Sequence, residues 1–490
     1  MLETTKTLRP RRVGLAAVAS VAALGTMVAL AGCTPAASGD SDKVTITLSG
    51  PNQFTSDTKT FGPAWDDLIA AFEKDNPDIT VKTNVLPLSS WSQTAAAQLT
   101  AGTAPELIFN QTQHTPEQVV SLDDAVQKPN EFSDTGKPWI EDFNPEYFGG
   151  EDRLGANVAG NYESIPFNLV SVGIYFNEDI LKEAGVEVED LKTFDGFTQA
   201  CGDIKDAGYT PLATDNGNLP VGWATTALSS MLLVPETEAV NQFGADGEAG
   251  TSSPVTIKSV AHGYLTDELN MTSDPGFAAT LELLKKLYDE CATPNWSGIK
   301  SEGAFTGGTE FPGGKAAMAW GTNFATSQLG EVDFDYGTVP FPTVSTSDSD
   351  LATGEPAQFG VSNGGTGYMI PAYIEGKQLD AALTFLQYVS SPKVQTWLDE
   401  TGGIPAVTAL TAPPGLEAMN EGVWATVSLG GQNGGLWRGP KAVSAENTRT
   451  GYLLGTTSLD EQLVKMNDNA IAWSKEQAVD GKWTEPWAAQ

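Results

Sequence analysis

The feature that most limits the fold is a regular alternation of strand-like and helix-like segments near the start of the chain. Residues 44–48 and 79–85 alternate apolar and polar side chains at a period of two, which predicts strands. A helix is predicted at 61–75, where four large side chains share one face: Trp65, Leu68, Ile69 and Phe72. A second helix at 92–100 precedes an apolar strand at 106–109. This order is typical of parallel βα units, so we expect an α/β fold.

Similar segments recur over the rest of the chain. We predict one more strand at 170–176 and further helices at 179–184, 194–207, 277–291 and 458–477. Two more helices are predicted within 378–398, separated by a Ser-Ser-Pro break at 390–392. A chain of 490 residues is longer than one hydrophobic core usually organises. We therefore expect two lobes, each with its own core.

The composition disfavours several classes of partner. The chain has 27 Lys and Arg against 62 Asp and Glu, a formal net charge of −35. Such a surface repels phosphate backbones, so we expect no nucleic-acid ligand. Only two histidines occur, His114 and His262, which disfavours a histidine-based zinc site or a cysteine–histidine nucleophile. We expect no metal and no other cofactor, while a glycosidase built on two carboxylates stays open.

The first 43 residues have the pattern of an export signal followed by a tether. Three arginines precede a stretch of small and apolar residues at 13–30, which predicts a secretory signal peptide over 1–32. The run Leu30-Ala31-Gly32-Cys33 resembles the lipobox of bacterial lipoproteins. This resemblance implies lipidation of Cys33, with diacylglycerol on its sulfur and an acyl chain such as palmitate. Residues 33–43 would then form a polar tether. Sec and twin-arginine export both stay open, and a membrane helix that contains a cysteine is the alternative.

Two further cysteines, Cys201 and Cys291, lie on predicted helices. An exported chain folds in an oxidising compartment, where disulfides persist. We predict that these two residues form a disulfide, and two buried free thiols are the alternative.

Five short motifs occur in order along the chain. Residues 102–106 read Gly-Thr-Ala-Pro-Glu, residues 176–186 read Phe-Asn-Glu-Asp-Ile-Leu-Lys-Glu-Ala-Gly-Val, and residues 193–197 read Thr-Phe-Asp-Gly-Phe. Residues 311–318 read Phe-Pro-Gly-Gly-Lys-Ala-Ala-Met, and the helical stretch 381–405 ends in Gly-Ile-Pro. Together they resemble segments of the extracellular solute-binding proteins of ABC importers, in the maltose-binding-like, carbohydrate-specific group.

This resemblance implies a two-lobed α/β fold of the type II periplasmic-binding-protein kind, whose lobes close on a ligand about a hinge. We expect lobe 1 to span 44–165 plus 363–410, and lobe 2 to span 166–362 plus 411–490. The glycine-rich run at 363–367 lacks the Gly-Lys-Ser/Thr of a phosphate loop, so we assign it to a crossing between the lobes.

The function implied by the resemblance is solute capture without catalysis. The protein would be a monomeric substrate-binding lipoprotein, outside the cytoplasm and lipid-anchored to the cell membrane. It would bind a sugar or oligosaccharide and deliver it to the membrane permease subunits of an ABC transporter. Two alternatives stay open: a secreted carbohydrate-active hydrolase, and the same fold binding a peptide, polyamine or phosphate ester.

Sugars stack their C–H faces on aromatic rings and present hydroxyls to amide and guanidinium groups. Such residues, placed after predicted strands or in glycine-rich turns, are our candidate ligand residues: Asn52, Gln53, Trp91, Asn110, Gln111, Asn168, Trp223, Asn323, Phe324, Trp437 and Arg438. Trp91, Trp223 and Trp437 lie beside turn residues, so ligand stacking and local packing are both open, and we expect Trp91 and Trp437 outside any helical apolar stripe. Three other tryptophans fall on helical stripes and are expected in cores: Trp65, Trp397 and Trp473.

Overall fold

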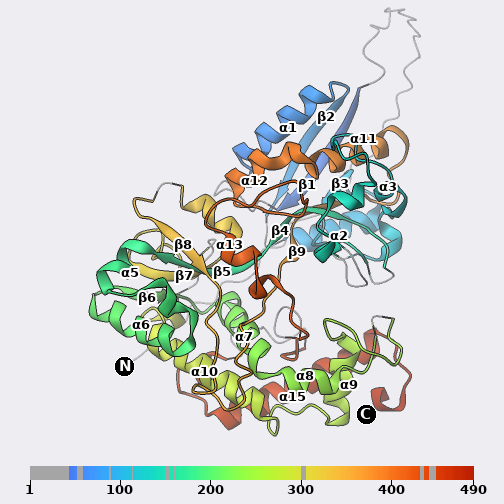
Figure 1. Ribbon diagram of the computed structural model, residues 1–490. Coiled ribbons are helices and arrows are strands. Elements are labelled where there is room, and N and C mark those ends of the chain that lie inside the picture. The colour runs from blue at the N-terminus through green and yellow to red at the C-terminus, as the bar shows by residue number, and fades with distance from the viewer. Residues whose placement is uncertain are drawn as a thin grey trace, which may run out of the picture. The chain divides into compact units, whose positions relative to one another are not determined.

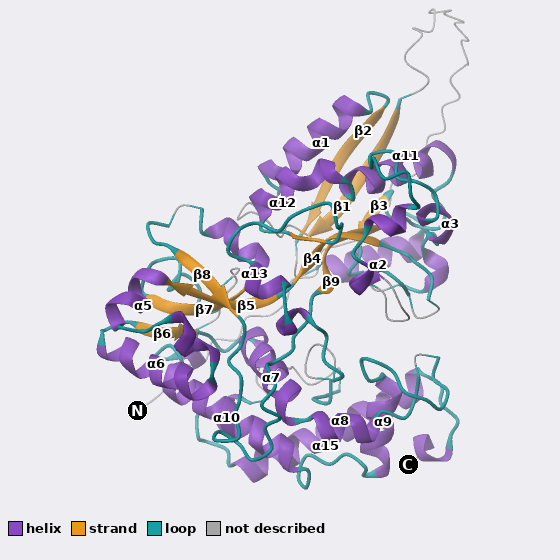
Figure 2. Ribbon diagram, viewed as in Figure 1, coloured by secondary structure: helices purple, strands orange, loops and turns teal. Residues whose placement is uncertain are grey.

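The part of the chain that the structure describes contains two β-sheets, each with helices around it (Figures 1 and 2). The structure is a computed structural model and describes residues 43–51, 59–87, 90–112, 114–148, 154–157, 160–244, 246–299, 305–330, 332–430, 435–440 and 449–489. Cys33, Asn52 and Gln53 therefore lie outside the described residues. We call the first sheet with its helices lobe 1, and the second sheet with its helices lobe 2.

Lobe 1 begins with the parallel βα units that the sequence predicts. Strand β1 (Val44–Pro51) pairs in parallel with both β2 (Ile79–Leu86) and β3 (Leu107–Phe109). The helices α1 (Pro63–Asp75) and α2 (Trp91–Ala101) connect these strands, which confirms the predicted order. Proline at the first helical position suits α1, because its fixed φ angle matches the first turn. The predicted apolar face of α1 is buried: Trp65, Leu68, Ile69 and Phe72.

The other strands of this sheet come from distant parts of the chain, in the order β10-β4-β9-β3-β1-β2. Strand β9 (Ser362–Met369) pairs antiparallel with β3 on one side and with β4 (Ile165–Val170) on the other. Strand β10 (Ile404–Pro405) extends the sheet beyond β4. The helices α11 (Gly376–Val389) and α12 (Gln395–Thr401) pack on β1 and α1, respectively (Figure 1). Lobe 1 is therefore built from segments that are far apart in the chain.

The chain crosses from lobe 1 to lobe 2 at Ser171. Strand β4 ends at Val170, and β5 (Val172–Asn177) already belongs to the second sheet. The expected lobe boundary at residues 165 and 166 is therefore too early, because β4 is held in the first sheet by its hydrogen bonds to β9. The return crossing leads into β9, whose strand includes the glycine-rich run at 363–367. This run is extended and opens no helix, which excludes a phosphate loop.

Trp65 lies at the centre of the lobe 1 core, with its side chain fully buried. Its ring packs edge-on against the rings of Phe167 and Tyr368, with 6.1 Å between the ring centroids in each pair. The centroid of the Trp397 ring is 5.3 Å away. These partners belong to β4, β9 and α12, so one indole joins the sheet to the helices above it. Edge-to-face aromatic pairs add about 0.5–1.5 kcal/mol each beyond the area that they bury. The prediction that Trp65 and Trp397 are core residues is confirmed.

Lobe 2 has a four-stranded sheet in the order β6-β7-β5-β8. Its other strands are β6 (Thr210–Ala213), β7 (Ala316–Thr322) and β8 (Tyr336–Val339). Its helices are α5 (Glu178–Ala184), α6 (Phe194–Asp206), α7 (Asn218–Leu232), α8 (Val234–Val240), α9 (Ile257–Thr266), α10 (Pro275–Cys291), α13 (Glu417–Asn420), α14 (Thr450–Leu453) and α15 (Leu459–Asp480). Lobe 1 has two further short helices, α3 (Asp123–Val126) and α4 (Pro145–Phe148). The 3₁₀ helix η5 (Asn323–Gln328) follows β7 directly.

Local capping explains where two helices of lobe 2 begin. The Thr193 hydroxyl accepts a hydrogen bond from the Gly196 N–H at the start of α6, as the sequence predicts. At the start of α15, Ser458 and Glu461 form a reciprocal capping box. Both helices then bury an apolar stripe, and the stripe of α15 includes Trp473.

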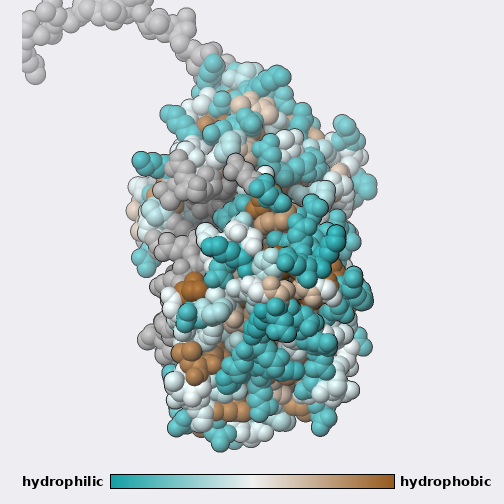
Figure 3. All heavy atoms as spheres, turned by 90° about the vertical axis from the view of Figure 1, so that its left-hand side faces the viewer, coloured by the Kyte–Doolittle hydropathy of each residue, from teal (hydrophilic) through white to brown (hydrophobic). Residues whose placement is uncertain are grey.

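The face shown in Figure 3 is mostly hydrophilic, with only scattered apolar groups. In the part of the chain that the structure describes, no helix is both long and apolar enough to cross a membrane.

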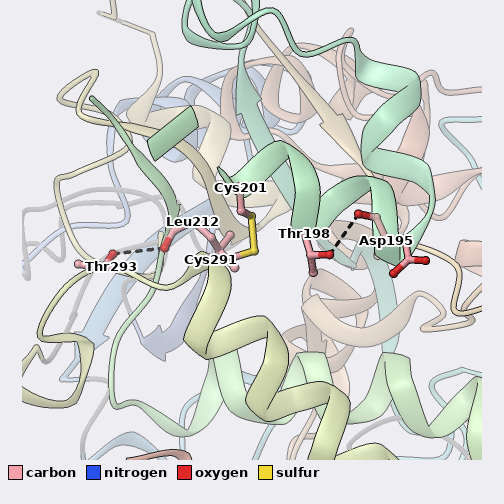
Figure 4. The surroundings of a disulfide bond; sticks show 6 residues. All are labelled: Asp195, Thr198, Cys201, Leu212, Cys291 and Thr293. Atoms are coloured by element: carbon pink, nitrogen blue, oxygen red, sulfur yellow. Dashed lines mark hydrogen bonds between the residues drawn. A yellow bond between two sulfur atoms is a disulfide. The ribbon is translucent and has the colours of Figure 1, made fainter. Parts of the chain in front are cut away.

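A disulfide joins α6 to α10 in lobe 2 (Figure 4). The bond connects Cys201 to Cys291, the pair expected from the sequence, and the two Cα atoms are 5.2 Å apart. Both residues are fully buried in the main core of lobe 2. The covalent link therefore closes a loop of the chain that contains β6, α7, α8 and α9.

Replacing both cysteines by alanine should lower the free energy of unfolding. The two residues are 90 positions apart, and the chain-entropy model gives at most about 4.7 kcal/mol for a loop of this size. Urea unfolding with and without a reductant measures the loss, and reduction should not change the double variant. Unfolded wild-type protein should react with two more equivalents of maleimide after reduction than before. Equal counts would contradict the bond.

Candidate ligand-binding site

A polar segment at the carboxyl end of β3 provides the first part of the site. The Asn110 N–H donates to the Gly367 carbonyl of β9 at 3.0 Å, so sheet pairing fixes the position of Asn110. A Cβ atom on Gly367 would come within 3.1 Å of Asn110 Nδ2, which explains why the neighbouring strand has glycine there. Gln111 follows with an exposed side chain. The structure thus places both predicted amides at the sheet edge, where α/β folds bind ligands.

His114 lies beside this segment and is paired with Glu163. Its Nδ1 is 2.7 Å from the Thr112 carbonyl, and its Nε2 is 3.0 Å from Glu163 Oε1. A histidine that donates from both ring nitrogens must be protonated. The hydrogen bond to Glu163 raises the pKa of His114 above its usual value, against the opposing effect of burial. Sequence reasoning did not pair His114 with Glu163, because the two residues are distant in the chain.

Two other predicted amides lie buried where the lobes join. Asn168, in β4, has no exposed surface, and its Nδ2 donates to Thr366 Oγ1 at 3.2 Å. Asn323, at the start of η5, uses both amide hydrogens and its carbonyl oxygen in hydrogen bonds within the protein. The expectation that the Asn323 amide faces a ligand is therefore wrong. Its neighbour Phe324 is also buried, with 9% of its surface exposed.

Two predicted aromatic platforms lie in helices instead of loops. Trp91 is the first residue of α2 and is 3% exposed, with its ring edge-on to Phe109 at 6.2 Å. Because α2 begins one residue earlier than predicted, Trp91 falls in register with the buried Ala95 and Leu99. The expectation that Trp91 lies outside a helical stripe is wrong. Trp223 is likewise inside α7, and its ring centroid is 6.0 Å from that of Trp320.

Trp437 is held by contacts on three sides in lobe 2. Its Nε1 donates to Ser229 Oγ at 2.8 Å, and its ring meets Phe277 edge-on at 4.8 Å. The guanidinium carbon of Arg449 lies 5.1 Å from the centroid of the same ring. Only 9% of Trp437 is exposed, although it lies in a glycine-rich loop as predicted. The indole therefore packs on α7 and α10 and also supports a cation.

Two buried arginines rest on tryptophan rings in this part of lobe 2. Arg449 stacks on Trp437, and burial lowers its pKa to about 10. The guanidinium carbon of Arg438 lies 5.1 Å from the ring centroid of Trp473, and burial lowers the pKa of Arg438 as well. Cation–π contacts offset part of the cost of removing such a charge from water. Arg449 was missed by sequence reasoning, because nothing in its local sequence distinguishes it from a surface arginine.

The carboxyl end of β6 brings further polar groups next to Arg449. Asp215 accepts hydrogen bonds from the Gly217 N–H at 2.6 Å and the Gly307 N–H at 2.9 Å, which orders the turn into α7. Asn216 accepts a hydrogen bond from Thr450 Oγ1 at 2.8 Å. Thr450 directly follows Arg449, so this bond ties the end of β6 to α14. Asn216 escaped prediction because the short strand β6 was not recognised.

A cavity of about 140 Å³ lies between α7, α8 and the chain near residue 430, and Ser229 is part of its lining. Hydroxyl and amide side chains supply most of its polar lining, from Thr226, Ser229, Ser230, Thr237, Gln358 and Ser428. The site residues thus fall into two groups. The lobe 1 group is Asn110, Gln111 and His114, and the lobe 2 group is Asn216, Trp437 and Arg449.

A family model described as bacterial extracellular solute-binding protein matches residues 55–396. This span includes most strands of both sheets. The chain belongs to the bacterial extracellular solute-binding protein family. The family resemblance and the two-lobed α/β fold inferred from the sequence are confirmed.

Individual relatives of this solute-binding protein are distant. It is 24% identical over 403 residues to the multiple sugar-binding protein of Streptococcus mutans, which covers 81% of this chain and 83% of the relative. A solved structure from work on xylan utilization by Caldanaerobius polysaccharolyticus has a TM-score of 0.61 and 16% identity, covering 87% of this chain and 99% of the other. A chitin oligosaccharide binding protein has a TM-score of 0.59 and 19% identity, and the match covers 88% of this chain and 99% of the other. These structures share the fold of this chain.

The pair His114–Glu163 should make stability depend on pH. Because folding raises the pKa of His114, the pair stabilises the fold fully below the unfolded-state pKa of about 6.5. This stabilisation is lost as the pH rises through the folded-state pKa. Glu163→Gln should therefore lower the melting temperature near pH 6 more than near pH 8. Glu189→Gln, at an exposed position, is the control, and equal losses at both pH values would contradict the pairing.

Proposed function

We propose that this chain is the substrate-binding component of an ABC transporter and captures a neutral sugar or oligosaccharide. One observation carries the proposal: each sheet has at least one amide side chain within three residues of the carboxyl end of a parallel strand. Asn110 and Gln111 follow β3 in lobe 1, and Asn216 follows β6 in lobe 2. Planar amides pair well with vicinal hydroxyls, which present a donor and an acceptor together.

The lobe 2 group supports the same class of ligand. Trp437 and Arg449 combine an aromatic ring with a guanidinium, the two kinds of group that bind the apolar face and the hydroxyl rim of a sugar. A net charge of −35 disfavours the alternative anionic ligands. The names of similar proteins also refer to sugars, chitin oligosaccharide and xylan. Binding would be followed by delivery to membrane permease subunits, with no bond of the sugar broken.

A melting-temperature screen tests this function. The panel is glucose, maltotriose, xylotriose and chitotriose, with spermidine, a tetrapeptide and glycerol 3-phosphate as the competing classes. A ligand at 100 times its dissociation constant stabilises the native state by about 2.7 kcal/mol, so at least one sugar should raise the melting temperature. Chromatography of the sugar afterwards should show no cleavage. Stabilisation only by a competing class, or release of shorter sugars, would contradict the proposal.

A matched pair of variants tests the lobe 1 group in the same screen. Gln111→Ala should weaken binding of the stabilising sugar about tenfold, the effect of one or two hydrogen bonds to a ligand, and leave the ligand-free melting temperature unchanged. Gln127→Ala removes an equally exposed amide elsewhere in lobe 1 and should change neither quantity. Equal affinities for the two variants would remove Gln111 from the site.

We also propose that the protein is a lipoprotein anchored through Cys33. The lipobox-like run before Cys33 and the polar residues after it support a lipid anchor. Cys33→Ala should leave the protein soluble or unprocessed, because the variant lacks the thioether that would attach it to the membrane. Fractionation of cells at high salt measures the distribution. A variant that is cleaved normally and still pellets with membranes would contradict the lipid anchor.

A further inference from the structure

The amide of Asn323 makes three hydrogen bonds where the two lobes meet. It lies at the start of η5, immediately after the lobe 2 strand β7, and it has no exposed surface. Its Oδ1 accepts a hydrogen bond from the Ser171 N–H at 3.1 Å. Its Nδ2 donates to the Gly402 carbonyl at 2.8 Å and to the Leu169 carbonyl at 3.3 Å. The Asn323 N–H also donates to the Ser171 carbonyl at 3.1 Å.

These partners belong to different parts of the molecule. Leu169 is in β4 of the lobe 1 sheet, and Gly402 ends α12 of lobe 1. Ser171 is the single residue between β4 and β5, where the chain crosses to lobe 2. One side chain of lobe 2 therefore binds the crossing residue and two separate elements of lobe 1.

The backbone around this junction leaves little room for change. Gly402 has a φ of 72°, and a Cβ atom there would collide with Thr326 Oγ1 and the Asn323 carbonyl. Thr326 Oγ1 donates to that carbonyl at 2.9 Å. A Cβ atom on the adjacent Gly403 would approach Asn168 Oδ1 to 2.8 Å. Two consecutive glycines thus let the end of α12 lie directly against η5 and β4.

We propose that Asn323 is a positioning residue that fixes the relative orientation of the two lobes and thereby sets the affinity for the solute without touching it. A buried amide with three partners cannot rotate away without leaving buried polar groups unpaired. Without this link the ligand-free lobes would sample more orientations, and ligand binding would have to order them. The effect on affinity rests on the proposed sugar-binding function, whereas the effect on the orientation of the lobes does not.

Asn323→Asp tests the link with a side chain of nearly the same shape. Aspartate keeps an oxygen for the Ser171 N–H but loses both donors, and it sets a carboxylate against the Gly402 and Leu169 carbonyls. Asn130→Asp is the matched control. Asn130 is 3% exposed, its Nδ2 donates to the Gln387 and Ser390 carbonyls, and its Oδ1 accepts from the Phe132 N–H. All of these partners lie within lobe 1, so this variant damages folding without touching the junction.

Three measurements separate positioning from stability: the melting temperature, small-angle scattering of the ligand-free full chain, and affinity for the panel sugars. Both variants should melt at lower temperature. Only Asn323→Asp should change the radius of gyration of the folded chain and weaken sugar binding, by about tenfold or about 1.4 kcal/mol. Unchanged scattering and affinity in Asn323→Asp, or equal changes in Asn130→Asp, would overturn the proposal.

A milder variant decides the question if Asn323→Asp does not fold. Asn323→Ser removes the amide that donates to the Gly402 and Leu169 carbonyls without adding a carboxylate, so it should change the scattering in the same direction by less. An unchanged profile would then overturn the proposal. If the wild-type chain binds no sugar in the panel, the proposed function fails, while the scattering comparison still decides whether Asn323 orients the lobes.

Discussion

The antiparallel pairing of β4 with β9 is the interaction on which the rest of the structure depends. These strands are nearly 200 residues apart in the chain, yet they lie side by side at the centre of the lobe 1 sheet. Their pairing joins the N-terminal strands of lobe 1 to the later segment that contains β9, and it directs the chain between β4 and β9 into lobe 2. Ser171 and the start of β9 become crossings for this reason. Long-range pairing of this kind is entropically expensive to form and is repaid by the buried core around Trp65.

The buried tryptophans of this protein have different roles, which depend on what their rings contact. Trp65 and Trp397 bind helices to a sheet, while Trp437 does two things at once, packing on Phe277 and supporting the Arg449 guanidinium. A buried arginine that rests on an indole keeps its planar donors in a fixed direction. In the proposed sugar site, these contacts would hold the lobe 2 group in place before the ligand binds, which would lower the ordering cost of binding. The exposed Gln111 in lobe 1 is the more adaptable partner.

The buried asparagines show how one residue type serves two purposes in a two-lobed protein. Asn130 closes a loop within lobe 1, and Asn323 joins the lobes, with the same number and kind of hydrogen bonds. Local sequence cannot separate these roles, because both residues stand near turns and both are polar. The difference arises only from which backbone groups the folded chain brings within 3 Å or so of each amide.

The sequence by itself determined the α/β class, the parallel units of lobe 1, the buried face of α1 and the cap of α6, because periodicity and capping depend on residues close together in the chain. It also determined the Cys201–Cys291 pair, because the small number of cysteines limits the possible partners. It also named Asn110 and Gln111, since they follow a recognisable strand. Tertiary structure alone decided that Trp91 joins a helical stripe, that Asn323 is enclosed by Leu169, Ser171 and Gly402, and that Arg449 lies on Trp437. Each of these depends on contacts between segments far apart in the chain, and the pattern around a single residue does not record which distant surface will cover it.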